Sequence, residues 1–419
     1  MKASQLFTKT TKNPPANETA RNAQLLIQAG FIHKEMAGVY AFLPLGLKVI
    51  EKIKTIVREE MNAVGGQELI MTNLQPREKW EVTTRWSDDV VDVWFKTKLK
   101  DDSEVGLAWS HEEPIIEMMK PFVSSYKDLP VNVYQFQTKL RNELRSKSGI
   151  MRGREFLMKD MYTATLDATQ HDKIYNDIME AYVRVFERLG LGDDTYVTYA
   201  SGGAFTKFSH EFQTVCETGE DTIYLHKKKN IAINEEVLDE ESLQKLGIGR
   251  DELEEVKSSE VGNIFNFGTE KSEQMDFTFT NESGEKQFIH LGSYGIGISR
   301  VMGVIAEKFA DDKGLVWPAN IAPATVYLAR LGEDKTVVDV TEKLYNDMRK
   351  RGIDVYYDDR DVRAGQKFAD ADLMGIPYRV VISEKTCQSG KHELKGRTES
   401  DNKMLDIDGI LEYLAPIGS

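Results

Sequence analysis

Two strand-like segments joined by a basic, glycine-containing stretch constrain the fold of this chain most strongly. Residues 131–140 alternate apolar and polar side chains, which is typical of a half-buried strand, and residues 155–165 also favour a strand. Gly149 and Gly153 lie in the stretch between them, and glycine is common in connections. The pattern predicts an antiparallel hairpin and, around it, a mostly antiparallel sheet with flanking helices.

Further segments before residue 320 would complete an α+β domain. Apolar side chains recur at helical spacing over residues 46–64, and Gly65 and Gly66 follow, which predicts a long helix that ends there. We also expect helices over 17–37 (with Asn17 as cap and a stop at Gly30 or shortly after), 114–120 and 172–189, and strands over 68–72, 90–97, 105–109, 277–279 and 287–291.

A regular alternation of strands and helices begins at Ala324 and predicts a second domain. Strands are expected at 326–329, 355–357 and 378–382, with helices at 337–350 and 368–374, so this domain is a small α/β unit with a mostly parallel sheet. The stretch WPANIAP at 317–323 marks the boundary. We therefore expect domains at 1–320 and 321–419.

Charge is unevenly distributed along the chain. The formal net charge of −14 argues against a protein that coats DNA. Residues 139–159 nevertheless hold seven Lys or Arg against two acids, whereas residues 235–260 hold ten acids against three bases. The basic stretch is a local candidate for anion binding. The acidic stretch predicts a small, charged, helical insertion at about 221–262.

Several classes of protein do not fit this sequence. No apolar run approaches the ~20 residues that span a bilayer, so we expect no membrane segment. The N-terminal stretch resembles neither a signal peptide nor a transit peptide, which favours the cytoplasm. The cysteines, Cys216 and Cys387, are far apart, which excludes a disulfide framework and gives no zinc spacing.

The hairpin carries residue types that bind nucleotides. Arg141 and Glu143 share one face of a strand, and Arg152 and Phe156 follow across the loop. A guanidinium can hold a phosphate with two donors, and an aromatic ring can stack on adenine. The loop residues Arg145 and Lys147 would face a larger polyanion. A solvated basic hairpin with a core Phe is the alternative.

A glycine-punctuated stretch, HLGSYGIGISR, ends in Arg300. It is not a dinucleotide fingerprint, because Arg stands where the last glycine would be, and no Gly-Lys-Ser/Thr follows as in a Walker loop. The glycines allow close backbone approach, and a guanidinium near a helix start suits a terminal phosphate. A packing turn is the alternative.

Two short motifs are candidates for binding a small substrate. In LAWSHEE, Ser110 and Glu112 could hold an ammonium or a secondary amine. The alternative is a helix cap, with Ser110 at the cap position and Glu113 three residues later. In FSHEF, His210 and Glu211 are candidate binding groups, although a lone His is more often structural.

With these pieces in this order, the chain resembles the class II aminoacyl-tRNA synthetases and, among them, the bacterial-type prolyl-tRNA synthetases. Residues 46–76 are similar to the first class motif, the hairpin to the second and GIGISR to the third. REFLMKD, SHEFQ, LVWP and DDRDVRAGQKFADADLMGIP look prolyl-specific. The resemblance implies a class II catalytic domain on an antiparallel sheet, followed by an α/β anticodon-binding domain.

The resemblance also implies a reaction, activation of L-proline by ATP with Mg²⁺ and transfer to tRNA(Pro), and roles for individual residues. Arg141 would bridge the proline carboxylate and the α-phosphate, and Arg152 and Arg300 would hold the outer phosphates. The remaining implied roles are ATP binding by Glu143 and Phe156, imino binding by Ser110, Glu112 and His210, acceptor-end binding by Arg145 and Lys147, anticodon reading by Arg363, Lys367, Phe368 and Asp370, and Mg²⁺ ligation by Glu211.

The resemblance further implies a homodimer formed through residues about 40–76. The anticodon domain is not basic, since residues 321–419 hold 15 Lys or Arg and 18 Asp or Glu, so base readout rather than a phosphate patch would supply specificity.

Some positions depart from the family pattern. Ser110 stands where Thr is usual, Ser293 where Cys is frequent and Asn263 where His is usual. The segment at 221–262 is too short for the hydrolytic domain that many bacterial relatives carry, which predicts an enzyme without cis editing of mischarged alanine. The rivals are a threonyl or histidyl enzyme, a regulatory paralogue and a bare tRNA-binding module. Threonyl enzymes use a zinc site with Cys and His ligands, and the sequence shows no such cluster. Regulatory paralogues tend to lose the ATP-binding arginines, which are present here as Arg141 and Arg300.

Overall fold

The computed structural model describes residues 1–144, 146, 148–201, 208–229 and 231–415. By its internal contacts the chain forms two compact units. One comprises Met1–Glu35, Tyr40–Ile53 and Ile305–Ser419, and the other comprises Met36–Val39 and Lys54–Val304.

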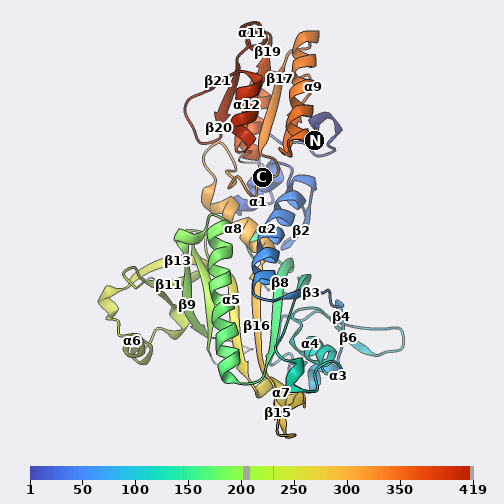
Figure 1. The fold of residues 1–419 in the computed structure, drawn as a ribbon, viewed down its shortest axis with the longest axis vertical. Coiled ribbons are helices and arrows are strands. Elements are labelled where there is room, and N and C mark those ends of the chain that lie inside the picture. Colours follow the sequence, from blue (N-terminus) through green and yellow to red (C-terminus); the bar gives the residue numbers. More distant parts are fainter. Residues whose placement is uncertain (145, 147, 202–207, 230, 416–419) are drawn as a thin grey trace. The chain divides into compact units, whose positions relative to one another are not determined.

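A nine-stranded sheet is the main element of the second unit (Figure 1). Its strand order is β10-β9-β12-β11-β13-β16-β8-β7-β3, and neighbours are antiparallel except for the parallel pairs β9–β12 and β3–β7. The expected antiparallel architecture is confirmed. The strands are β3 (Gln67–Glu68), β7 (Val131–Leu140), β8 (Glu155–Thr165), β9 (Thr195–Ser201), β10 (Phe208–Val215), β11 (Asp221–His226), β12 (Ile231–Asn234), β13 (Glu254–Gly268) and β16 (His290–Gly297).

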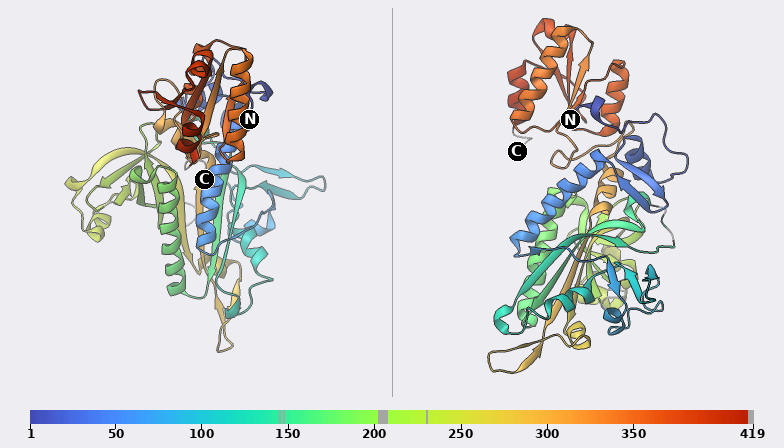
Figure 2. Two further views of the ribbon diagram at one scale, coloured as in Figure 1. Left: turned by 45° about the horizontal axis from the view of Figure 1, so that its top comes forward. Right: turned by 90° about the vertical axis from the view of Figure 1, so that its right-hand side faces the viewer.

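Helix α5 (Ala168–Arg188) runs alongside the long strands in both Figure 1 and Figure 2. It begins earlier than expected because the Asp167 carboxylate accepts a hydrogen bond from the Gln170 backbone N–H, at 2.8 Å, and so caps the helix. The smaller elements of this unit are α3 (Glu78–Glu81), α4 (Glu112–Met119), α6 (Glu240–Leu246), α7 (Glu270–Gln274), the sheet of β4 (Leu74–Pro76), β5 (Lys96–Lys98) and β6 (Glu104–Leu107), and the hairpin of β14 (Thr278–Thr280) and β15 (Lys286–Phe288).

The C-terminal part of the other unit has a five-stranded sheet in the order β18-β17-β19-β20-β21. The strands β18, β17 and β19 are parallel, as predicted, whereas β20 and β21 add antiparallel pairs. The elements are β17 (Val326–Leu331), α9 (Lys335–Lys350), β18 (Val355–Asp358), α10 (Ala364–Met374), β19 (Tyr378–Ser383), α11 (Glu384–Ser389), β20 (His392–Gly396), β21 (Lys403–Leu405) and α12 (Ile407–Leu414).

The helix expected over 17–37 is wrong at its start, whereas the stop expected at Gly30 or shortly after is confirmed to within two residues, because the helix ends at Gln28. Helix α1 covers only Arg21–Gln28, and its cap is Ala20 rather than Asn17. Gly30, with φ of 76°, turns the chain, and the residues that follow form a hairpin of β1 (Ile32–Met36) and β2 (Val39–Phe42). The long helix is confirmed as α2 (Pro44–Ala63), and α8 (Ile298–Phe309) follows the glycine-rich strand.

Three other expectations need correction. Of the strand expected over 68–72, only Glu68 lies in a strand, as the last residue of β3. Residues 90–93 are not a strand, because Val91 packs instead in a cluster with Trp80, Trp94 and Trp109. The acidic segment is not a helical appendage, since it contributes β11, β12 and β13 to the main sheet, and within its described residues α6 is accompanied only by two short 3-10 turns, Glu235–Val237 and Arg250–Glu252.

Candidate active site

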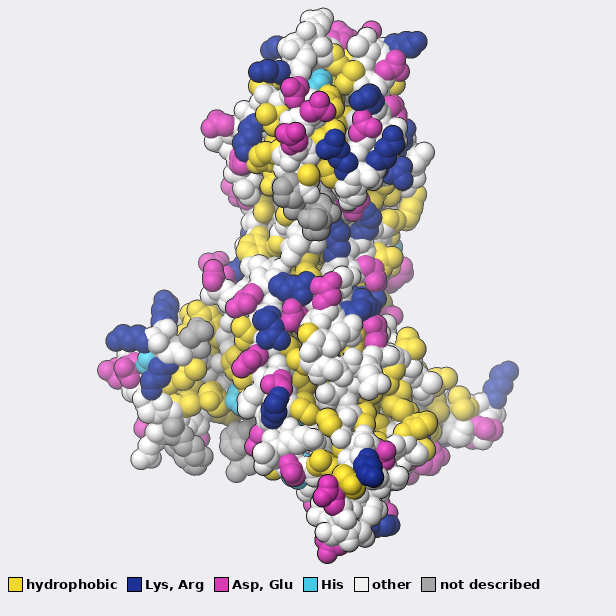
Figure 3. All heavy atoms as spheres, viewed as in Figure 1, with side chains coloured by type: hydrophobic (Ala, Val, Ile, Leu, Met, Phe, Trp, Pro, Cys, Tyr) yellow, Lys and Arg dark blue, Asp and Glu magenta, His cyan; other side chains and the backbone are white. Residues whose placement is uncertain are grey.

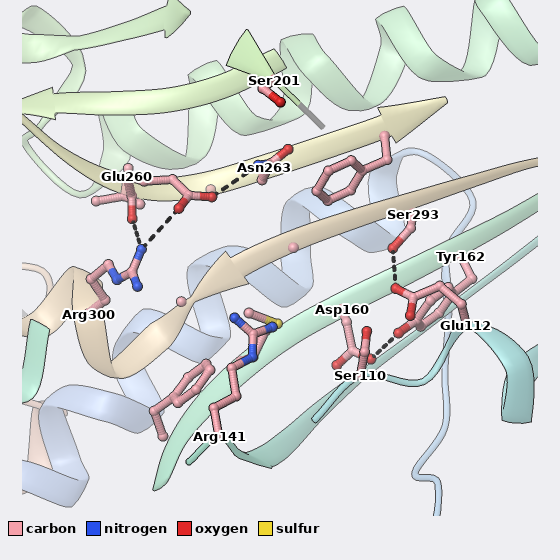
Figure 4. Close-up of a pocket in the computed structure, with 17 residues that line it drawn as sticks. Ser110, Glu112, Arg141, Asp160, Tyr162, Ser201, Glu260, Asn263, Ser293 and Arg300 are labelled. Atoms are coloured by element: carbon pink, nitrogen blue, oxygen red, sulfur yellow. Dashed lines mark hydrogen bonds and ion pairs between the residues drawn. The ribbon is translucent and has the colours of Figure 1, made fainter. Parts of the chain in front are cut away.

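A cavity of about 260 Å³ opens on one face of the main sheet (Figure 4). Strand β8 lines it with alternate residues, which share a face because side chains alternate along a strand. The neighbouring β16 contributes Ser293, Gly295 and Gly297, in register with β8. A Cβ on Gly295 would lie 3.7 Å from the Met158 sulfur, an ordinary van der Waals distance. The β8 residues are Phe156, Met158, Asp160 and Tyr162.

One end of the cavity is acidic and lies around Glu112 (Figure 4). Glu112 is 3% exposed and accepts hydrogen bonds from Ser293 Oγ (3.1 Å) and Arg85 Nη1 (3.3 Å). Burial alone would raise the pKa of Glu112, but the charge of Arg85 lowers it below its usual value. Glu112 is therefore a carboxylate, available to a cationic ligand. The alternative of a Ser110 cap is wrong, because α4 begins after His111 and no side chain caps it.

Arg85 forms ion pairs with the acidic side chains at this end of the cavity. Its guanidinium is 2% exposed and also binds Glu113, at 2.9 Å. It lies against the faces of Trp80 and Trp109, with ring centroids 5.3 and 4.6 Å from Cζ. Lys271 provides a second cation to Glu113, at 3.2 Å. The sequence interpretation did not find Arg85, and its only local signal was an arginine placed between two tryptophans, Trp80 and Trp86.

Arg141 lies between the two ends of the cavity (Figure 4). Its Nε donates to the Trp109 carbonyl at 3.3 Å, and its Cζ lies 5.3 Å from the Phe156 ring centroid. Within the described residues no carboxylate forms an ion pair with it. Burial of the guanidinium, and then the charge of Arg300, lower the pKa of Arg141, so its positive charge is only partly compensated. An anion bound at this point would balance that charge.

The far end carries Arg300 and Glu260 (Figure 4). Arg300 Nη1 donates to the Glu260 carbonyl at 2.6 Å and to its carboxylate at 3.3 Å. The sequence interpretation missed Glu260, because it lies in the acidic segment that was expected to be an exposed insertion.

The other residues of the second motif lie outside the cavity lining. Arg152 forms ion pairs with Glu143 (3.0 Å) and with Glu220 (2.6 Å), which precedes β11. The guanidinium groups of Arg152 and Arg300 thus each already hold a carboxylate where a phosphate is expected. Arg145 and Lys147, expected to meet the tRNA acceptor end, lie outside the described residues.

His210 and Glu211 occupy β10, and neither lines the cavity among the residues described. His210 Nδ1 is 2.8 Å from the Tyr175 hydroxyl, and burial lowers the pKa of the imidazole. Glu211 accepts hydrogen bonds from Gln213 and Asn234, at 2.8 and 3.1 Å. Burial, and then the negative charge of Glu260, raise the pKa of Glu211 to about 8.

The four candidate anticodon residues lie on or beside α10 and differ in accessibility. Arg363 is exposed and Phe368 is half-buried, with Arg379 stacked over its ring at 4.4 Å. Lys367 is 2% exposed and donates to the carbonyls of Arg330 and Asp358. Asp370 is also buried and accepts from Arg360 and Thr10. As placed here, Lys367 and Asp370 shape the domain, and Arg363 and Phe368 are the accessible members.

Acidic and basic side chains are interspersed on the viewed face of the C-terminal domain (Figure 3), with no broad basic patch there. Among the described residues, no group of three or more His, Cys, Asp or Glu is arranged to hold a metal ion. No helix in the described part of the chain is long and apolar enough to cross a membrane.

Comparisons with known proteins agree with this geometry. The model of the tRNA synthetase class II core domain (G, H, P, S and T) matches residues 95–309, and that of an anticodon-binding domain matches residues 325–416. The chain is 35% identical to a proline–tRNA ligase of Caulobacter vibrioides, over 99% of both chains. It is 36% identical to one of Rhodopseudomonas palustris, over 99% of this chain and all of the relative.

Solved structures show the same fold. A prolyl-tRNA synthetase of Cryptosporidium parvum complexed with L-proline and AMP matches with a TM-score of 0.77 at 16% identity, over 95% of this chain and 74% of that one. The matched domains, the full-length relatives and the arginine-lined cavity together show that this chain belongs to the class II aminoacyl-tRNA synthetases and, within them, to the proline–tRNA ligase family.

Proposed function

We propose that this chain activates L-proline with ATP to form prolyl-adenylate and then transfers the prolyl group to the 3′ end of tRNA(Pro). The observation that carries the proposal is the order of charges along the cavity, with Glu112 at one end, Arg141 in the middle and Arg300 at the other end. This order complements an amino-acid cation, its carboxylate and a polyphosphate. The names of the relatives, proline–tRNA ligases, support proline and tRNA as substrates.

The first step joins the amino-acid carboxylate to the α-phosphate and releases pyrophosphate, and a ribose hydroxyl of the tRNA then displaces AMP. The attacking carboxylate is already an anion, so the protein needs no activated nucleophile. Its contribution is orientation and charge neutralisation. Arg141 bridges the carboxylate and the α-phosphate, Arg152 and Arg300 hold the outer phosphates, and Phe156 and Glu143 hold adenine.

Glu112 and Ser110 bind the imino group. His210 stays a predicted contributor, although it lies outside the cavity lining. We further propose anticodon reading by α10, with Arg363 and Phe368 in contact and Lys367 and Asp370 in support. A homodimer through residues 40–76 and a cytoplasmic location complete the proposal. Ile70 and Leu74, 77% and 54% exposed, are apolar side chains that such an interface would cover.

Amino-acid-dependent exchange of pyrophosphate into ATP tests this function, with each of the twenty amino acids in turn. The expected result is strong exchange with proline and transfer of the product to tRNA(Pro). A regulatory paralogue or a bare tRNA-binding module would show no exchange with any amino acid. If another amino acid drives exchange and proline does not, that amino acid is the substrate instead of proline.

Glu211 and Glu260 fit the Mg²⁺ that accompanies ATP. Their carboxylates are close enough for the charge of one to raise the pKa of the other, and carboxylate oxygens are the ligands that Mg²⁺ prefers. When bound, the ion would neutralise charge on the phosphates. Glu211 would then hold the ion from β10, and Glu260 would hold it once Arg300 has turned to a phosphate.

Binding of Mg²⁺ with ATP is expected to release a proton at pH 7. Because the pKa of Glu211 is about 8, the free protein keeps a proton there that a cation must displace. The release should decline as the pH rises above 8, where Glu211 is already ionised. Calorimetry at pH 7 in two buffers of different ionisation enthalpy measures the number of protons. Glu211→Gln should lower that number, and an unchanged value would contradict the assignment.

We also propose that the chain lacks cis editing, because β11, β12 and α6 occupy the interval where a hydrolytic domain would stand. Proline and alanine differ by few methylenes, each worth about 1–3 kcal/mol in a pocket. Purified protein is therefore expected to form some alanyl-tRNA(Pro) and to leave it intact. Charging of tRNA(Pro) with serine, which is polar, serves as the comparison for charging with alanine. Rapid loss of alanine from preformed alanyl-tRNA(Pro) on adding the protein would show editing.

A further inference from the structure

Asp160 is a second carboxylate at the acidic end of the cavity, and one of its oxygens has no partner among the described residues. Asp160 lies on β8 and is 3% exposed. Its Oδ2 accepts hydrogen bonds from Tyr162 (2.7 Å), Lys139 (2.8 Å) and Gln135 (2.9 Å). Its Oδ1 is buried without a hydrogen-bond partner. An unsatisfied buried carboxylate oxygen is costly, so this position suits a ligand that brings a donor.

A buried lysine, Lys139, keeps Asp160 ionised. Burial alone would raise the pKa of Asp160, but Lys139 lowers it below its usual value. Lys139 is itself completely buried and also contacts His111 Nδ1. Because that nitrogen faces a donor, it accepts, and His111 Nε2 donates to the Thr72 carbonyl at 3.1 Å. Burial lowers the pKa of His111 to about 4, so the imidazole is neutral and Asp160 balances the lysine charge.

The Asp160 network also fixes the segment that carries Glu112. His111 is held at both ring nitrogens and stands between Ser110 and Glu112 in the sequence. Asp160, Glu112 and Ser110 all line the same end of the cavity (Figure 4). Two ionised carboxylates therefore face the space where the amino-acid nitrogen is expected.

We propose that Asp160 determines specificity for the ring nitrogen of the substrate, accepting one N–H through Oδ1 while Glu112, together with Ser110, accepts the other. The protonated ring nitrogen of an imino acid has two N–H donors, and this arrangement provides one carboxylate for each. The proposal rests on the proposed function, because it assumes that a cyclic imino acid occupies this cavity.

The test compares two ligands in the wild type and in Asp160→Asn. The first is L-proline, and the second is (S)-tetrahydrofuran-2-carboxylate, in which a ring oxygen without hydrogen replaces the N–H₂⁺ group. The variant should raise KM for proline by roughly ten- to a hundredfold, the loss expected for a charge-assisted hydrogen bond, with KM for ATP unchanged. The inhibition constant of the oxygen analogue should stay constant or fall, because the variant relieves repulsion between the ring oxygen and the carboxylate.

Control variants separate ligand contact from support. Tyr162→Phe removes one donor to Oδ2 and keeps the carboxylate, so it should affect both ligands alike and by less. If Asp160→Asn fails to fold, the double variant Lys139→Gln with Asp160→Asn removes the ion pair without leaving a buried charge, and the same comparison of ligands applies. Equal weakening of proline and the analogue would reduce Asp160 to a structural role and overturn the proposal. Absence of proline-dependent exchange in the wild type would instead refute the proposed function.

Discussion

Replacement of Arg141 by alanine is expected to remove proline-dependent ATP–pyrophosphate exchange almost completely. Its guanidinium lies between the acidic and the phosphate ends of the cavity and forms no ion pair with a carboxylate among the described residues. It is therefore the cation placed to neutralise both the attacking carboxylate and the α-phosphate. Loss of one preorganised donor at such a position costs roughly 10²–10³ in rate, and Arg141 would serve two anions.

Arg141→Lys should also be poor, because an ammonium is a point charge and cannot bridge two anions with a fixed pair of donors. Exchange rates at saturating proline and ATP measure both variants. Arg184→Ala is the matched control, since Arg184 is an exposed arginine of the same unit that pairs with Glu60 at 2.9 Å. Near-normal exchange in Arg141→Ala would remove this residue from the mechanism, even if the family assignment stands.

Replacement of Arg85 by methionine is expected to lower the free energy of unfolding by about 3–5 kcal/mol, the usual cost of removing one partner of a buried ion pair. Arg85 holds Glu112 and Glu113, and all three side chains are at most 3% exposed. Lys271 would remain as a cation near Glu113, but Glu112 would lose its nearest positive charge. The pKa of Glu112 should then rise, which weakens binding of a cationic substrate.

Urea denaturation and KM for proline measure the two effects of Arg85→Met. The exposed pair of Lys173 and Asp177, 2.6 Å apart on α5, provides the control, and Lys173→Met should change stability by less than about 0.5 kcal/mol. Adding Glu113→Gln to Arg85→Met should restore part of the stability, because one uncompensated carboxylate is removed. A loss of stability below about 1 kcal/mol in Arg85→Met would contradict the prediction, because it would show that the two carboxylates do not need this cation in the folded state.

The elements that local pattern determines could be predicted from the sequence. The bounds of β7 and β8 match the expectation, because alternation and a glycine-containing loop are local signals. Arg141, Phe156, Arg300, Ser110 and Glu112, which were inferred from motifs, do line one cavity. Asp160 shares the cavity-facing side of β8, four residues beyond Phe156, but the sequence analysis assigned it no role.

What the sequence could not supply depends on contacts between distant segments. Arg85 meets Glu112 and Glu113 only because the tryptophan cluster folds against α4. The strand β13 was hidden by its exposed acidic start, Glu254 and Glu255, whereas its buried positions Val261 and Ile264 carry the packing. Lys367 and Asp370 show the opposite case, since charged residues that suggested an exposed reading surface are satisfied within the domain.

The ion pair between Arg300 and Glu260 has a consequence for the order of events at the phosphate end. In the free protein each charge is satisfied by the other, at 3.3 Å. A phosphate that takes the guanidinium releases the carboxylate, and the released carboxylate increases the negative charge beside Glu211. Nucleotide and divalent cation should therefore bind with positive cooperativity, each raising the affinity for the other by the same factor.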